Sequence, residues 1–326
     1  MDSFIPQNNI LNKKRFFVEA INKAAQEQGI ETNWMSGDWI CRLQKGDTHH
    51  FIYGYNFPLN SSTVWEVARD KTGASMLLSN AKIPCVVHEL FMAPNLSTYI
   101  SKDGNWNRII ELSKEWKFPL VCKDNRGTGG NSVYKVHTQQ DLEIALEEVW
   151  KVARGAALSP FCEIENEYRF FVLDGEVELA YKKVIPHIVG DGVSTVLELM
   201  KSQIKSQDTQ SNALAEQDSS LCDWSYIPKE NEKYSIGWKF NLSKGGTVEM
   251  INIDDFPQVI EIVMKTVKEL NLRICSVDII KLKNSNDYLV LEVNTGISTE
   301  HFSKNSSEAR QMAEALYSKI LFKLFQ

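Results

Sequence analysis

The sequence lacks an excess of basic residues, a long apolar run and any paired cysteine motif. Its 36 Lys and Arg residues against 42 Asp and Glu residues give a formal net charge of −6. Because no local basic patch stands out either, we expect no nucleic-acid partner. No apolar run approaches the roughly 20 residues that span a bilayer, and the first residues lack the basic and apolar segments of a signal peptide. We therefore expect a cytoplasmic protein without a membrane partner.

The 6 cysteines are widely scattered along the chain. None forms a Cys-x-x-Cys pair or stands with histidine at zinc-finger spacing. Most of them stand beside apolar residues, which favours buried, reduced thiols over a zinc site. Their positions are Cys41, Cys85, Cys122, Cys162, Cys222 and Cys275.

The apolar pattern predicts a mixed α/β protein in which 326 residues form about two domains or three lobes. Helices are expected at 14–29, 62–80, 106–115, 138–152, 257–270 and 307–325, where apolar residues recur at helical spacing. Thr138, with Asp141 three residues later, gives the fourth of these a clear start signal. Strands are expected at 39–43, 49–55, 84–88, 118–123, 132–136, 168–173, 176–182, 275–281 and 288–293. The polar stretch 202–222 predicts a mobile loop, of a length that favours a functional lid.

A lysine followed by a glycine-rich turn separates two expected strands. The segment reads Lys123-Asp-Asn-Arg-Gly127-Thr-Gly129-Gly130. Glycines allow backbone N–H groups to approach phosphate oxygens closely, and successive amides form an anion-binding concavity. The segment is not a Walker A loop, because its lysine precedes the glycines and a strand follows. A glycine-rich hairpin without a ligand stays an open alternative.

Two carboxylates and an amide are expected on one face of the last hairpin. Asp278 lies in one strand, and Glu292 and Asn294 end the next, about opposite it. Since side chains alternate across a strand, Glu292 and Asn294 share a face, away from their apolar neighbours. Neighbouring carboxylates repel unless a cation lies between them, and oxygen ligands suit Mg²⁺. The alternative is a solvated edge with scattered acids.

Two further segments are weak signals when taken alone. Lys239-Phe-Asn241-Leu-Ser-Lys244-Gly-Gly246 combines a cation, an amide and a turn that could line a polyphosphate. A polar loop explains it equally well. Lys71 stands on an expected helix, where a lysine is usually solvated.

In their order along the chain, these segments resemble the ATP-grasp carboxylate–amine ligases, over about residues 62 to 305. The set includes an Asp-Lys helix, Ile-Pro, Val-Cys-Lys with the glycine turn, Glu-Tyr-Arg, Asn-Leu-Ser-Lys-Gly-Gly, and Val-Asp with Glu-Val-Asn. The segment from Ala180 to Leu199, with its Val-Gly-Asp-Gly run, is similar to the ligase modules of cyanophycin synthetase and bifunctional glutathione synthetase. The resemblance implies an ATP-grasp fold, which is an α/β (α+β) fold that holds ATP between two subdomains.

The resemblance also implies roles for the matching residues. The nucleotide phosphates would meet lysines and glycines at Lys71, Lys123, Gly127, Gly129 and Gly130. The backbone of a hinge at Phe161 and Cys162 would contact adenine, and the carboxylate of Glu167 would bind ribose. Arg169 lies in the same segment, and the pair near the γ-phosphate is Lys239 and Asn241. Magnesium ligands would be Asp278, Glu292 and Asn294, with Mn²⁺ as an alternative ion.

The implied lobes are an N-terminal substrate lobe at 1–95, a central subdomain with the glycine turn at 96–185, and a C-terminal subdomain with the metal site at 186–326. The implied reaction joins amino acids or small peptides by an amide bond, through an acylphosphate, with release of ADP. Segments 124–131 and 202–222 are candidate lids that exclude water. The family also suggests a homodimer, although the sequence identifies no interface.

Departures from the family limit the transfer of a substrate. After Asn294 many relatives continue with Pro-Gly, whereas this chain continues Thr295-Gly-Ile-Ser-Thr-Glu-His301. The further catalytic domains of the two similar synthetases have no counterpart, so we expect a ligase with a single reaction. Alternatives are a non-ligating ATP-binding regulatory or scaffold protein, and another ATP-grasp reaction such as carboxylation or thioester formation.

Overall fold

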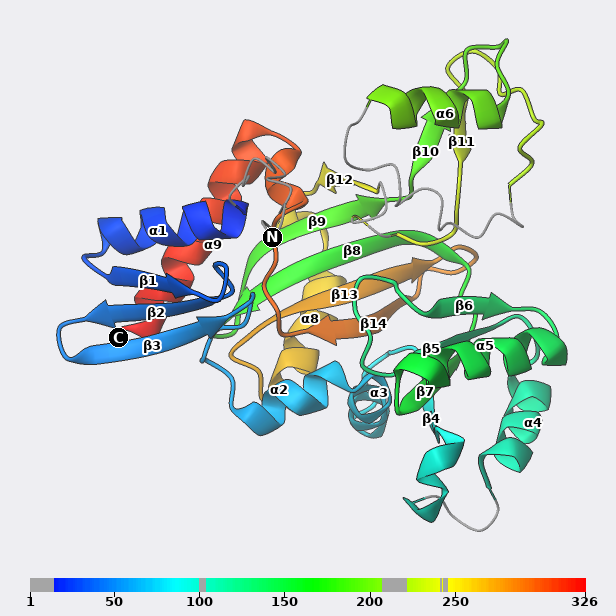
Figure 1. Ribbon diagram of the computed structural model, residues 1–326, viewed down its shortest axis with the longest axis horizontal. Coiled ribbons are helices and arrows are strands. Elements are labelled where there is room, and N and C mark those ends of the chain that lie inside the picture. The colour runs from blue at the N-terminus through cyan, green and yellow to red at the C-terminus, as the bar shows by residue number, and fades with distance from the viewer. Residues whose placement is uncertain (1–14, 100–103, 207–221, 241, 243–245) are drawn as a thin grey trace, which may run out of the picture. The chain divides into compact units, whose positions relative to one another are not determined.

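The structure is a computed structural model that describes residues 15–99, 104–206, 222–240, 242 and 246–326 (Figure 1). It divides into two compact units, Met1–Tyr55 with Ser298–Gln326, and Asn56–Ile297. The mixed α/β class expected from the sequence is confirmed. The three lobes 1–95, 96–185 and 186–326 stay a prediction. None of the helices in the described part of the chain is both long enough and apolar enough to span a bilayer.

The first unit combines the two ends of the chain. A three-stranded antiparallel sheet in the order β1-β2-β3 packs its apolar face, with Cys41, Leu43 and Ile52, into the interior. The elements are α1 (Phe16–Glu27), β1 (Glu31–Met35), β2 (Ile40–Lys45), β3 (Thr48–Tyr53), η5 (Phe302–Lys304) and α9 (Ser307–Leu324). The expected hairpin and last helix are therefore confirmed.

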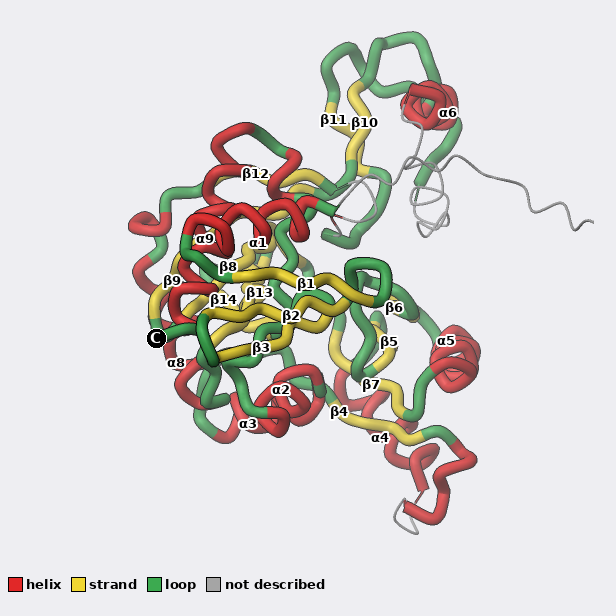
Figure 2. Tube along the Cα trace, turned by 60° about the vertical axis from the view of Figure 1, so that its left-hand side comes forward, coloured by secondary structure: helices red, strands yellow, loops and turns green. Residues whose placement is uncertain are grey.

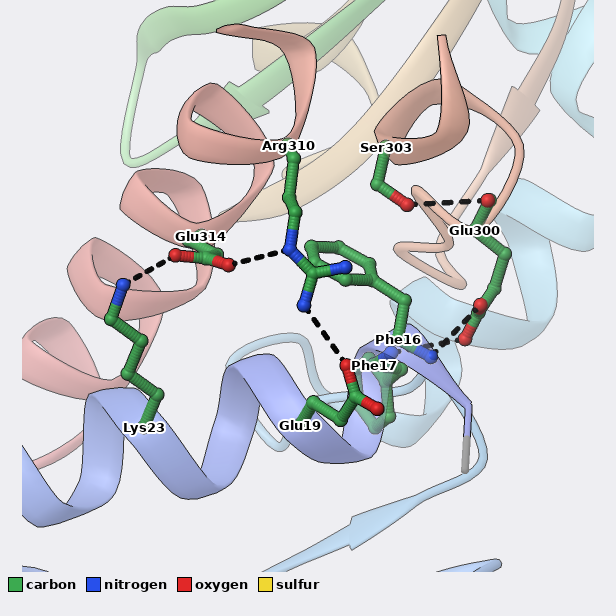
Figure 3. A network of polar contacts seen from close by, with 8 residues as sticks. All are labelled: Phe16, Phe17, Glu19, Lys23, Glu300, Ser303, Arg310 and Glu314. Atoms are coloured by element: carbon green, nitrogen blue, oxygen red, sulfur yellow. Dashed lines mark hydrogen bonds and ion pairs between the residues drawn. The ribbon is translucent and has the colours of Figure 1, made fainter. Parts of the chain in front are cut away.

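Glu300 ties the C-terminal segment to the start of α1 (Figure 3). Its carboxylate accepts hydrogen bonds from the backbone N–H groups of Phe16, at 3.2 Å, and Phe17, at 3.0 Å. A carboxylate is favourable there because the first N–H groups of a helix have no partner within the helix. Between α1 and α9, Arg310 pairs with Glu19 at 2.9 Å.

The second unit contains a five-stranded antiparallel sheet in the order β12-β9-β8-β13-β14. Its strands are β8 (Ile164–Leu173), β9 (Glu176–Val184), β12 (Thr247–Met250), β13 (Ile274–Leu282) and β14 (Tyr288–Asn294). Apolar residues of one face form a core with α2 (Ser62–Arg69), α3 (Lys71–Asn80) and α8 (Pro257–Glu269), which follows η4 (Ile253–Asp255). The other face is left for polar side chains.

A four-stranded antiparallel sheet in the order β4-β7-β5-β6 follows the same plan. Its strands are β4 (Glu89–Met92), β5 (Leu120–Asp124), β6 (Val133–Val136) and β7 (Gly155–Pro160). Helices α4 (Gly104–Trp116), which follows η1 (Pro94–Tyr99), and α5 (Gln139–Val152) flank it and share its apolar core (Figure 2). The expected start of α5 is confirmed as a capping box between Thr138 and Asp141.

The Val-Gly-Asp-Gly run forms a turn in a small substructure. This consists of β10 (His187–Val189), α6 (Val196–Ser206) and β11 (Lys233–Ser235) around Ile188, Val196 and Ile236. A Cβ atom on Gly190 would lie 2.2 Å from the backbone oxygen of Lys229. Asp191 accepts hydrogen bonds from the N–H groups of Val193 and Ser194. The run therefore has a structural reason, which is a close backbone approach that only glycine allows.

Three expectations about elements were wrong in detail. The helix expected at 62–80 is two helices, because Asp70 leaves the helical conformation and caps α3 by accepting from the N–H of Gly73 at 2.7 Å. The strand expected at 84–88 begins only at Glu89, and Cys85 forms an isolated bridge with Val290. The loop expected at 202–222 begins with the last turn of α6, and residues 207–221 lie outside the described residues.

We predict that Gly190→Ala loosens the substructure around Ile188. The added methyl group meets two backbone oxygens, of Lys229 and Pro228, at 2.2 and 2.6 Å, so the chain must move. Overpacking of this kind costs about 1–3 kcal/mol. Hydrogen–deuterium exchange should rise in β10 and β11. The matched control is Gly73→Ala, whose methyl group meets only the Asp70 side chain, at 3.3 Å. Equal exchange in both variants would contradict the assignment.

Candidate active site

The polar face of the five-stranded sheet gathers charged side chains from four neighbouring strands. In the register, Asp278 on β13 lies opposite Arg169 on β8 and, on its other side, opposite Glu292 on β14. Glu167 on β8 lies opposite Lys183 on β9. Paired residues of antiparallel strands project to the same face, away from the apolar core of the sheet. The expected position of Asp278 opposite Glu292 is confirmed.

These charges form a buried network of ion pairs. Arg169 donates from Nε and Nη2 to the two carboxylate oxygens of Asp278, each at 2.6 Å. Lys183 donates to Asp278 Oδ2 at 2.9 Å and also to Glu167. The Asp278 side chain is 1% exposed and that of Lys183 is 6% exposed. Such burial is tolerated because every charge has an opposite partner.

The network moves the pKa values of its members in different directions. Burial acts to raise the pKa of Asp278, but Arg169 and Lys183 outweigh it and hold that pKa well below its usual range. For Glu167, burial outweighs the attraction of Lys183 and raises the pKa to about 7. Asp278 is therefore a permanent anion at neutral pH, whereas Glu167 is close to titration.

The three residues expected to hold Mg²⁺ lie at neighbouring positions of β13 and β14. Asn294 follows Glu292 by two positions and donates to its Oε1 at 3.1 Å. Carboxylate and amide oxygens are suitable ligands for Mg²⁺. In the part of the chain that the structure describes, however, no three His, Cys, Asp or Glu side chains are grouped to hold a metal. The charge of Asp278 is already balanced by the cations of Arg169 and Lys183, and the magnesium-ligand roles of Asp278, Glu292 and Asn294 stay a prediction.

The glycine turn is tied to the start of α3. Lys71 donates from Nζ to the carbonyl oxygen of Gly127 at 2.5 Å, and Thr72 donates from its backbone and hydroxyl groups to Asn125 Oδ1. Gly129 and Gly130 have positive φ angles, 69° and 68°, which favour glycine. Lys71, which alone would not have been selected, is thus brought to the turn by tertiary structure.

Lys123 is buried beside this turn, at 6% exposed. Burial is the main reason why its pKa falls to about 8, with Lys71 lowering it further and Glu292 opposing the fall. Lys71 and Glu292 also line one small cavity, of about 10 Å³, together with Cys85 and Val86. Lys71 of α3 and Glu292 of β14 therefore both influence the charge state of Lys123.

The segment at Phe161 and Cys162, expected to be the hinge, contacts the segment around Lys239 through aromatic rings. Phe161 follows β7 and lies with its ring centroid 5.6 Å from that of Trp238. The ammonium group of Lys135 lies 3.7 Å from the Phe161 centroid. Lys239 donates to the carbonyl oxygen of Val133 at 2.7 Å. Cys162 is half-buried, and burial raises its pKa.

Of the expected residues, the structure places Lys123, Glu167, Arg169, Asp278, Glu292 and Asn294 on strands of the second unit, and Asn241 lies outside the described residues. The sequence reasoning missed Lys183, His88 and Trp238. Lys183 could have been found from strand alternation, because it stands two residues after the inward-facing Tyr181. His88 and Trp238 carry buried ring nitrogens without a hydrogen-bond partner among the described residues, a feature that no local pattern indicates.

Similarity to known proteins agrees with this architecture. Residues 233–316 match the RimK-like ATP-grasp domain family. The whole chain superposes on a bifunctional glutathione synthetase from Pasteurella multocida with a TM-score of 0.58 and 17% identity, covering 96% of this chain and 44% of that one. The fold is the ATP-grasp fold. A D-alanine–D-alanine ligase from Bacillus anthracis gives a TM-score of 0.50 at 17% identity, over 79% of this chain and 66% of that one.

Curated sequences show the same ATP-grasp relationship. A glutathione biosynthesis bifunctional protein of Listeria welshimeri is 28% identical over 307 residues, which cover 85% of this chain. Cyanophycin synthetase of Trichormus variabilis is 23% identical over 298 residues, again 85% of this chain. The chain spans only 37% and 31% of the lengths of these two relatives. The resemblance expected from the sequence is confirmed, while the residue roles in the ATP-grasp site stay predictions.

We predict that Arg169→Met lowers the free energy of unfolding by about 3–5 kcal/mol, because Asp278 would lose one of its two cationic partners while buried. Urea unfolding at pH 7 measures the change. The matched control is Arg273→Met, which removes an equivalent two-point pair with Asp174 whose arginine side chain is 51% exposed. An exposed pair is worth about 0–1 kcal/mol. Similar losses in the two variants would contradict the assigned role of burial.

We also predict that Lys123→Met stabilises the fold at pH 7. The pKa of Lys123 is about 8 in the folded chain against an ordinary 10.5, so the unfolded chain binds more protons between these values. The free energy of unfolding of the wild type therefore rises with pH over that range. At pH 7 it is about 3 kcal/mol lower than it would be if Lys123 kept its ordinary pKa.

The advantage of Lys123→Met should shrink above pH 8 and vanish near pH 10.5. Urea unfolding at several pH values measures it. The exposed Lys268 of α8 supplies the control, Lys268→Met, which should leave the pH profile unchanged. A constant difference between wild type and Lys123→Met at every pH would show that the ammonium charge is not its cause.

Proposed function

We propose that the chain is an ATP-dependent carboxylate–amine ligase that releases ADP and forms an amide bond between amino acids or small peptides. The observation that carries the proposal is that Lys71, which bonds to the glycine turn, and Glu292 of the five-stranded sheet line one cavity, and that Glu292 and Glu167 act to raise the pKa of Lys123. A polyphosphate between the two faces would meet cations from one sheet and cation-binding carboxylates from the other. The name of the Listeria relative, a glutathione biosynthesis protein, agrees with peptide-like substrates.

In this proposal the nucleotide is held by the residues on both faces. Lys71 and Lys123 neutralise phosphate charge, and the backbone N–H groups from Gly127 to Gly130 donate to phosphate oxygens. The hinge at Phe161 and Cys162 meets adenine, and Glu167 accepts from the ribose hydroxyl groups. Burial makes the interactions of Lys123 and Glu167 stronger than they would be in water.

Asp278, Glu292 and Asn294 would hold Mg²⁺, or Mn²⁺, which supplies charge neutralisation along the phosphates when it is bound. The donor set fits such an ion in chemistry, since Glu292 and Asn294 offer oxygen atoms on one face. Arg169 and Lys183 would fix the orientation of the Asp278 carboxylate through the pairs described above. Lys239, with Asn241, would stabilise the negative charge that develops at the γ-phosphate.

The proposed reaction has two steps. A substrate carboxylate oxygen attacks the γ-phosphorus atom, the bond to the β-phosphate oxygen breaks, and ADP leaves an acylphosphate behind. The nitrogen of an amine then attacks the acyl carbon, inorganic phosphate leaves, and the amine loses a proton. Water must stay away between the steps because it would hydrolyse the acylphosphate.

One observation favours a second candidate, an ATP-binding protein that does not ligate. Both carboxylate oxygens of Asp278 already accept hydrogen bonds from Arg169, which leaves Glu292 as the carboxylate with fewer partners. A protein of this kind would bind the nucleotide without turnover. Carboxylation or thioester formation is a further alternative within the same fold.

We predict that Lys123→Ala and Glu292→Ala each lower ADP release at least about 100-fold, since each would remove a group that balances charge in the transition state. The assay is Mg²⁺-dependent ADP release against pooled amino acids and small peptides. Product masses from active pools should equal two substrates minus water.

Lys268→Ala and Glu261→Ala, exposed on α8, are the controls and should keep full activity. Full activity in Lys123→Ala or Glu292→Ala would overturn the site assignment. Binding of ATP without turnover on any pool would support the non-ligating alternative. A product mass that reports an added carboxyl group, or a thioester, would support the other reactions.

A further inference from the structure

His88 is a buried side chain with unsatisfied hydrogen-bonding groups. It is 6% exposed, and neither of its ring nitrogens has a hydrogen-bond partner among the described residues. A buried donor or acceptor without a partner costs about 1–3 kcal/mol, so such a group usually has a function. No family role was expected for this position from the sequence.

His88 immediately precedes β4, and strand alternation assigns it to the face of the four-stranded sheet that carries Lys123. In the register, Leu90 on β4 lies opposite Ala157 on β7, and Ala157 lies opposite Lys123 on β5. Alternation places position 88, two residues before Leu90, on this face as well. Glu89, which points to the opposite face, pairs with Arg108 of α4. The imidazole therefore lies on the polar side of the sheet, away from its helices.

The surroundings keep the imidazole neutral. Burial, followed by the positive charges of Lys123 and Lys71, outweighs the opposing effect of the Val86 backbone and lowers the pKa of His88 well below its usual value. A neutral imidazole has one N–H donor and one acceptor nitrogen. The two lysines disfavour a further cation at this position, and their combined charge attracts an anion.

We propose that His88 is a third phosphate-binding side chain of the nucleotide site, whose neutral imidazole donates a hydrogen bond to a phosphate oxygen held between Lys71 and Lys123. This inference rests on the proposed function, because it takes the ligand to be a nucleotide. A neutral donor suits the position, since it adds a hydrogen bond without the repulsion that a third cation would meet.

The test compares His88→Leu with wild type in calorimetric titrations with ADP and with adenosine, in the presence of Mg²⁺. The affinity for ADP should fall about tenfold, while the affinity for adenosine, which has no phosphate, should be unchanged. The melting temperature of the free protein should stay equal or rise, because the variant removes a buried group without a partner. His88→Gln and His88→Asn keep an N–H donor, and at least one of them should restore part of the ADP affinity.

A spectroscopic readout separates a phosphate contact from a merely structural role. The ¹⁵N resonance of one His88 ring nitrogen should shift when ADP is added and should not shift when adenosine is added. His50→Leu, in the other compact unit, is the control and should leave ADP affinity unchanged. Equal ADP affinity in His88→Leu and wild type, together with unshifted ring nitrogens, would overturn the role of His88.

Lys123→Ala distinguishes this failure from failure of the proposed function. If Lys123→Ala weakens ADP binding but His88→Leu does not, the nucleotide site stands and only the His88 inference falls. If wild type binds neither ADP nor ATP, the proposed function and the His88 inference fall together.

Discussion

The buried ion-pair network around Asp278 is the interaction on which the rest of the second unit depends. Asp278, Arg169, Lys183 and Glu167 come from three adjacent strands, and each would be too costly to bury alone. Their mutual pairing is possible in one register only, because a shift by one residue would turn each charge into the apolar core on the other face. The network therefore links the alignment of β8, β9 and β13 to the chemistry of the polar face.

The two larger sheets of the second unit each have one apolar face and one face with charged side chains. Apolar faces pack against α2, α3 and α8 in one sheet, and against α4 and α5 in the other. The polar faces hold groups that reduce stability in the free chain, notably Lys123, whose pKa is lowered by burial, and His88, whose ring nitrogens have no hydrogen-bond partner in the part of the chain that the structure describes. In the proposed function, a bound polyphosphate would give both groups a partner.

Local patterns predicted a large part of the structure because they depend on neighbouring residues. The capping box at Thr138 and the pairing of Asp278 with Glu292 follow from short spacing in the sequence. The strand expected at 84–88 was wrong, since its apolar residues are used in a single bridge to Val290 and not in a ladder. Lys183 was missed because its importance comes from partners on two other strands.

The sequence by itself determined the alternation in β13 and β14, the start of α5 and the glycine turn, because φ/ψ preferences and side-chain periodicity act over a few residues. It also carried the resemblance to the ATP-grasp fold. Only the tertiary structure decided that Lys71 meets the carbonyl of Gly127, that Arg169 and Lys183 balance Asp278, and that His88 is buried beside two lysines. Burial and electrostatic energy depend on which distant strands come together, and a linear pattern does not contain those distances.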